Sequence, residues 1–156
     1  MFSNPDLDIE HPQSLIEYLE GRGLLRRGER PEVRILTGGI SSRVVLVTRR
    51  NGESWVLKQA LPKLRVAVDW FSNPARVHRE AAALRWLTDL GIDVPALRFE
   101  DRDLHLLAMD AVSEPHENWK TMLLAGRLEM YHVDTFGHIL ADIHTRSSAR
   151  RAEIAD

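Results

Sequence analysis

The segment VRILTGGISSRVVLVTRRNGESWVLK, which begins at Val33, combines β-branched residues with two glycine-containing turns. Val33–Leu36 and Val44–Val47 have the composition of β-strands, and the pair Gly38-Gly39 interrupts the run between them. Asn51-Gly52 is typical of a two-residue hairpin turn, so a third strand is expected directly after it. The segment therefore predicts a three-stranded antiparallel meander.

A helix and a second hairpin are predicted after the meander. Ala75–Leu90 is rich in alanine and leucine and is followed by Gly91, which is the pattern of a capped helix. Ala96–Glu100 and Leu104–Met109 are short β-prone stretches separated by a polar turn. The sequence thus predicts an α+β fold with a five-stranded antiparallel sheet and one packed helix.

Three further helices are expected outside this region. Pro12–Glu20 places Leu15, Ile16 and Leu19 at helical spacing, which predicts a short amphipathic helix. Helices are also predicted around Trp119–Ala125, before Gly126, and over Asp134–Thr145.

The composition excludes several classes of function. The chain has 21 Lys and Arg against 23 Asp and Glu and a net charge of -2, so nucleic acid is not an expected partner. The chain contains no cysteine, which excludes a disulfide framework and a cysteine nucleophile. His132, His138 and His144 are not at the i, i+4 spacing that aligns metal ligands on a helix, so no metal site is expected. With no export signal or membrane-spanning stretch evident, the prediction is a cytoplasmic protein.

Lys58 and Glu80 form the sharpest candidate site. On a helical wheel Glu80 falls between Val77 and Leu84, in the middle of the apolar stripe, so its carboxylate is expected to point inward. A lone buried charge costs roughly 3–5 kcal/mol, which predicts a cationic partner, and Lys58 on the third strand is the natural one. Alternatively, Glu80 lies at the edge of the stripe and pairs with a surface arginine, either Arg76 or Arg85.

The turn over residues 37–42 is the second candidate feature. Its glycines would let backbone N–H groups approach a phosphate without obstruction by side chains. It is not a Walker A loop, because no Lys-Ser/Thr pair follows at the required spacing. It does not open a helix either, which argues against a dinucleotide-binding fingerprint.

In the order of these features, residues 33–147 resemble the N-terminal lobe and following helices of the aminoglycoside phosphotransferase and choline kinase group, which has a protein-kinase-like fold. Lys58-Gln59-Ala60-Leu61-Pro62, with Arg65 after it, looks most like the lysine strand of methylthioribose kinases. Gly39-Ile40-Ser41-Ser42-Arg43-Val44 is similar to a kinase glycine-rich loop in which Ser42 replaces a glycine.

The resemblance implies an ATP site. Lys58 would hold the α- and β-phosphates, and Glu80 would orient it. Val44 and Val56 would line the adenine pocket, with Met109 at its back wall. The backbones of Asp110 and Val112 would form hydrogen bonds with adenine. The complete expected set for ATP is Gly38, Gly39, Ser41, Ser42, Val44, Val56, Lys58, Glu80, Met109, Asp110 and Val112.

The resemblance also implies what this chain lacks. The family's H-G-D-x-x-x-x-N motif and its second metal-binding Asp do not follow Ser147, so no catalytic residue is assigned and Mg²⁺ is expected only if the missing lobe is supplied. The expected organisation is an N-terminal helical extension over 1–30, an ATP-binding lobe over 31–112, and the hinge and first helices of a truncated C-lobe over 113–156.

Three readings follow. The first is the ATP-binding portion of a small-molecule kinase, inactive alone, whose acceptor hydroxyl compound (methylthioribose, choline, an aminoglycoside or another) would contact the missing lobe. The second is a non-catalytic nucleotide-binding or protein-interaction module, with a second copy or a partner chain covering the exposed lobe face. The third is a coincidental arrangement that binds no nucleotide.

Overall fold

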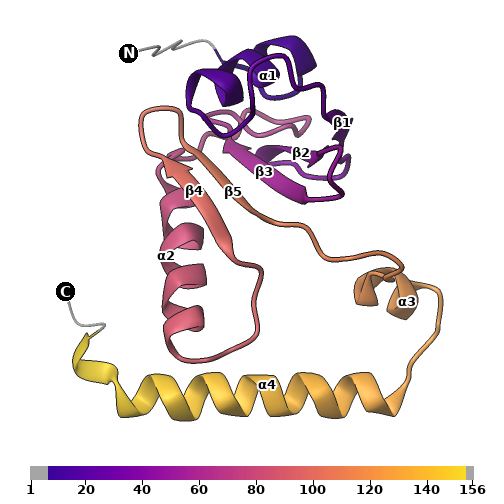
Figure 1. The fold of residues 1–156 in the computed structure, drawn as a ribbon. Helices are drawn as coiled ribbons and strands as arrows, with labels where there is room; N and C mark the ends of the chain where they lie inside the picture. The colour runs from indigo at the N-terminus through magenta and orange to yellow at the C-terminus, as the bar shows by residue number, and fades with distance from the viewer. Residues whose placement is uncertain (1–6, 154–156) are drawn as a thin grey trace. The chain divides into compact units, whose positions relative to one another are not determined.

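The computed structural model describes residues 7–153 (Figure 1). By its contacts the chain divides into two compact units. The first runs to Leu84 and resumes over Pro95–Ala111, and the second comprises Arg85–Val94 and the chain from Val112 onward.

A five-stranded antiparallel sheet forms the centre of the first unit. Its strands are β1 (Glu32–Ile35), β2 (Ser42–Thr48), β3 (Ser54–Ala60), β4 (Leu97–Asp101) and β5 (Leu106–Asp110). Their order across the sheet is β1-β2-β3-β5-β4, and every neighbouring pair is antiparallel. The predicted α+β class and five-stranded sheet are confirmed.

The two faces of the sheet carry different residues because side chains alternate along each strand. One face packs against helix α1 (Pro12–Gly21), which lies beside β2 and β3 (Figure 1). Val45, Val47 and Leu57 of this face form one core cluster with Leu15, Ile16 and Leu19 of the helix. The N-terminal helix is therefore part of the core of this unit. The other face presents Ala60, Leu107 and Met109 to helix α2 (Arg76–Asp89), through Val77 and Ala81.

The second predicted hairpin is shifted at its turn. β5 begins at Leu106 and not at Leu104, because His105 has a φ of 47°, in the left-handed region that cannot continue a strand. Strand β5 pairs with β3, which leaves β4 at the edge of the sheet.

The second unit contains α3 (Trp119–Leu124), α4 (Met130–Ala149) and a short 3₁₀ helix, η1 (Arg151–Glu153). Helix α4 begins four residues before the predicted Asp134 and extends past Thr145. The rings of Trp119 and Phe136 lie 5.5 Å apart between their centroids. Within residues 7–153, every helix is too short or too polar to span a bilayer.

Candidate functional site

Four of the predicted residues share one face of the sheet. In the register of β2, β3 and β5, Val44 lies opposite Lys58 and Val56 lies opposite Met109. The four side chains therefore stand on adjacent strands, on the face that packs against α2. Val56 is partly buried there and Met109 is 8% exposed, so an apolar patch adjoins the lysine.

Lys58 and Glu80 form the predicted ion pair. Nζ of Lys58 lies 2.5 Å from Oε1 of Glu80, and the side chains are 30% and 41% exposed. The expectation that Glu80 points into the core is wrong. Helix α2 buries Val77 and Ala81, so the centre of its apolar stripe is rotated away from Glu80, which lies at the stripe's edge. Both charges are therefore open to a ligand from solution.

The glycine turn lies between β1 and β2 and is exposed over residues 37–40. Gly38 has a φ of 101°, which side chains rarely tolerate, and a Cβ on Gly39 would come within 3.3 Å of the Ser42 carbonyl oxygen. Within the described part of the chain, no hydrogen bond occupies the N–H groups of Gly38, Gly39 or Ile40. These donors are free to bond an anion.

Backbone hydrogen bonds fix the C-terminal side of this turn. The N–H of Leu61 donates to the carbonyl of Ser41 at 3.0 Å, and that of Arg65 donates to the carbonyl of Ile40 at 2.8 Å. Ser42 already belongs to β2, where it pairs with Ala60. The turn is thus anchored to the chain that leaves the lysine strand.

Asp110, at the end of β5, and Val112 are the residues whose backbones are predicted to hydrogen-bond adenine. The N–H of Asp110 donates to the carbonyl of Ala96 at 2.9 Å. Of the two backbone groups of Asp110, the carbonyl is therefore the one that could hydrogen-bond the adenine base. Val112 belongs to the second unit and is 61% exposed. Within the first unit the structure therefore groups Val44, Val56, Lys58, Glu80 and Met109.

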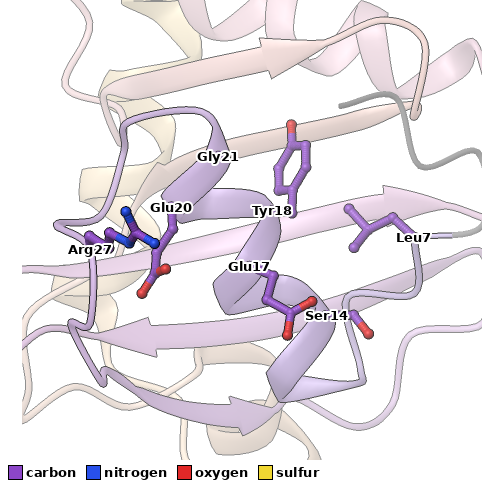
Figure 2. Close-up of a pocket in the computed structure, with 7 residues that line it drawn as sticks. All are labelled: Leu7, Ser14, Glu17, Tyr18, Glu20, Gly21 and Arg27. Carbon is purple, nitrogen blue, oxygen red and sulfur yellow. The ribbon is translucent and has the colours of Figure 1, made fainter. Parts of the chain in front are cut away.

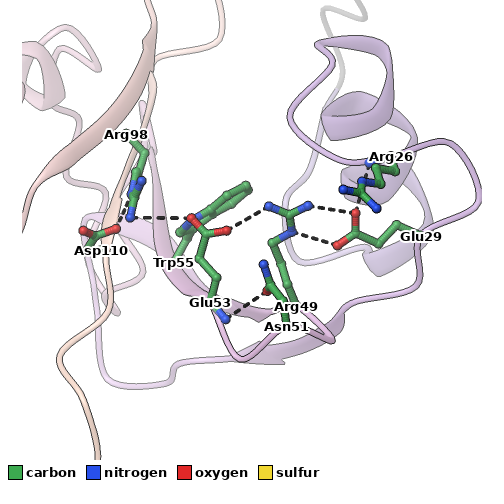
Figure 3. A network of polar contacts seen from close by, with 8 residues as sticks. All are labelled: Arg26, Glu29, Arg49, Asn51, Glu53, Trp55, Arg98 and Asp110. Carbon is green, nitrogen blue, oxygen red and sulfur yellow. Dashed lines mark hydrogen bonds and ion pairs between the residues drawn. The ribbon is translucent and has the colours of Figure 1, made fainter.

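The Asp110 side chain belongs to a polar network that the sequence did not predict (Figure 3). Nε of Arg98 donates to Asp110, and Arg98 also lies 3.5 Å from Glu53. Arg49 joins Glu53, at 2.8 Å, to Glu29, which it contacts at 2.7 and 2.9 Å. Hydrogen bonds from Arg49 lower the pKa of Glu29 to about 2 and raise the pKa of Arg49 itself.

A pocket of about 590 Å³ lies beside α1, away from the predicted residues (Figure 2). Tyr18 there donates its hydroxyl proton to Asp101 at 2.7 Å, and burial together with this bond raises the tyrosine pKa. The pocket is lined by Leu7, Ser14, Glu17, Tyr18, Glu20, Gly21 and Arg27.

The residues present fit a nucleotide better than a metal ion. A lysine ammonium, free backbone donors and an apolar patch are the groups that bind phosphates and a base. Among residues 7–153, no group of three or more His, Asp or Glu side chains could hold a metal ion.

The first unit thus has a five-stranded antiparallel sheet in which a strand lysine, Lys58, forms an ion pair with Glu80 of helix α2. The chain belongs to the phosphotransferase enzyme family, whose model matches residues 32–153. No curated protein matches the chain.

Among solved structures, the chain is similar to the streptomycin-ATP-APH(2")-IIa ternary complex, with 19% sequence identity and a TM-score of 0.45. The match covers 83% of this chain and 34% of that one, so the chain spans about a third of the length of that protein.

Proposed function

We propose that this chain supplies the ATP-binding part of a phosphotransferase that moves the γ-phosphate of ATP to a hydroxyl group of a small molecule. The observation that carries the proposal is the Lys58–Glu80 pair, at 2.5 Å, beside the apolar patch of Val44, Val56 and Met109. Family membership supports the reaction class.

The ion pair would hold the Lys58 ammonium in position for the phosphates before the nucleotide binds. Glu80 draws the Lys58 ammonium toward α2, and the partial exposure of both side chains leaves the ammonium's remaining protons open to phosphate oxygens. The free N–H groups of the glycine turn would bond further phosphate oxygens, and the apolar patch would take the base.

Transfer itself needs groups that these 156 residues do not contain. No H-G-D-x-x-x-x-N motif occurs in the sequence, and no metal-ligand cluster occurs among residues 7–153. Phosphoryl transfer depends on positioning and on metal-assisted charge stabilisation. We therefore expect this polypeptide to bind ATP without transferring phosphate, and Mg²⁺ to require ligands supplied by another part of the enzyme.

Calorimetric titration with ATP tests the binding proposal. Lys58→Met removes a charge-assisted contact worth about 1.5–3 kcal/mol, so ATP affinity should fall roughly 10- to 100-fold. Lys63→Met is the matched control, because Lys63 is 55% exposed, pairs with Asp69 and is absent from the patch. Equal ATP affinity of Lys58→Met and the unchanged chain would contradict the proposal.

A further inference from the structure

Arg76, the first residue of α2, directs its guanidinium to backbone carbonyls. Its Nη2 donates to the carbonyl of Ser41, at the end of the glycine turn, and to that of Leu61 at 3.1 Å. Its Nη1 donates to the carbonyl of Asn73 at 3.2 Å. All three of these acceptors are backbone carbonyl oxygens.

The carbonyls that Arg76 joins come from segments far apart in the sequence. Ser41 ends the glycine turn, Leu61 follows the lysine strand, and Asn73 precedes α2. The Ser41 carbonyl also accepts the N–H of Leu61 at 3.0 Å. The Arg76 side chain therefore ties the glycine turn to helix α2.

Helix α2 contacts both candidate phosphate-binding elements. Arg76 and Glu80 are four residues apart, which places them on the same face of the helix, one turn apart. Glu80 bonds Lys58, and Arg76 bonds the glycine turn. A displacement of α2 would then move the lysine contact and the turn together.

We propose that Arg76 is a positioning residue that holds the glycine turn in register with Lys58 for the polyphosphate of the nucleotide. The proposal rests on the proposed function, and it makes α2 the element that couples the turn to the lysine. A guanidinium suits this role because its rigid fork donates to several acceptors at once, whereas an ammonium cannot span the same three carbonyls.

The test compares Arg76→Met and Arg76→Lys with Arg79→Met, a control at an exposed arginine of the same helix. ATP binding is measured by calorimetry and adenosine binding by ligand-observed NMR. Arg76→Met should lose roughly tenfold in ATP affinity with adenosine affinity unchanged, and Arg76→Lys should recover part of the loss. Arg79→Met should match the unchanged chain.

Hydrogen exchange in the ligand-free chain separates failure of this proposal from failure of the proposed function. Without Arg76 the turn is held less firmly, so the Leu61 and Arg65 amides, which donate to Ser41 and Ile40, should exchange faster in Arg76→Met than in Arg79→Met. Unchanged exchange in Arg76→Met would overturn the role of Arg76, whether or not ATP binds.

Two binding results would also overturn it. One is an equal loss of ATP and adenosine affinity in Arg76→Met, which is the signature of a general structural defect. The other is unaltered ATP affinity in Arg76→Met while Lys58→Met binds ATP more weakly. That result would support the proposed function but not the positioning role of Arg76.

Discussion

The coupling between Lys58 and Glu80 should be small in the free protein. At the observed separation of 2.5 Å, the Coulomb energy is about 7 kcal/mol at an effective dielectric of about 20 and about 1.7 kcal/mol in water. Since the side chains are 30% and 41% exposed, solvent screens the pair strongly. We expect a coupling free energy of about 0.5–1 kcal/mol, as for other solvent-accessible pairs.

A double-mutant cycle measures this coupling. Lys58→Met, Glu80→Gln and the double variant are unfolded in urea, and the coupling is the departure of their unfolding free energies from additivity. The Lys63–Asp69 pair is the matched control. Its atoms are 2.7 Å apart, but its side chains are 55% and 75% exposed, so its coupling should be close to zero.

Two results would refute this reasoning. A coupling above about 3 kcal/mol would mean that the pair is buried, as the helical wheel alone suggested. A coupling of zero, with the Glu80→Gln variant binding ATP as well as the unchanged chain does, would mean that the two side chains do not meet in solution.

Two further predictions concern the stability of the sheet unit. Because Arg49 lowers the pKa of Glu29 from 4.5 to about 2, the stabilisation from this pair should be complete above about pH 4.5 and lost as the pH falls toward 2. The unfolding free energy of Glu29→Gln, measured in urea across that window, should therefore fall less with decreasing pH than that of the unchanged chain. Equal pH dependence of the two unfolding free energies would contradict this prediction. The buried Gln59 donates to the Leu7 carbonyl at 2.8 Å, so Gln59→Ala should lower the unfolding free energy by about 1–3 kcal/mol. The control, Gln13→Ala at an exposed position of α1, should change it little. Similar unfolding free energies for the two variants would count against the hydrogen bond between Gln59 and Leu7.

Local patterns predicted the elements of the fold well. The β-branched runs around Gly38-Gly39 and Asn51-Gly52, and the alanine-rich helix before Gly91, are set by residues close in sequence, and the structure confirms them. The strand order was not predictable in the same way. It depends on which strand pairs with β3 across a long connection, and only the fold places β5 there.

The candidate site was predicted in part. Strand alternation puts Lys58 on the face that packs against α2, and Glu80 reaches it from the edge of the helix's apolar stripe. The helical wheel did not show that burial in α2 centres on Val77 and Ala81 and leaves Glu80 41% exposed. The hydrogen bonds that Arg76 donates were not predicted, because their acceptors, the carbonyl oxygens of Ser41 and Leu61, are backbone atoms with no sequence signature.

Labelling with a lysine-reactive acyl-phosphate derivative of ATP tests the central claim most directly. Lysine occurs in this sequence only at positions 58, 63 and 120, so the chain contains its own controls. A phosphate-binding Lys58 should carry the label selectively, as located by mass spectrometry, and an excess of ATP should prevent the modification. Similar labelling of all three lysines, unaffected by ATP, would contradict nucleotide binding at Lys58.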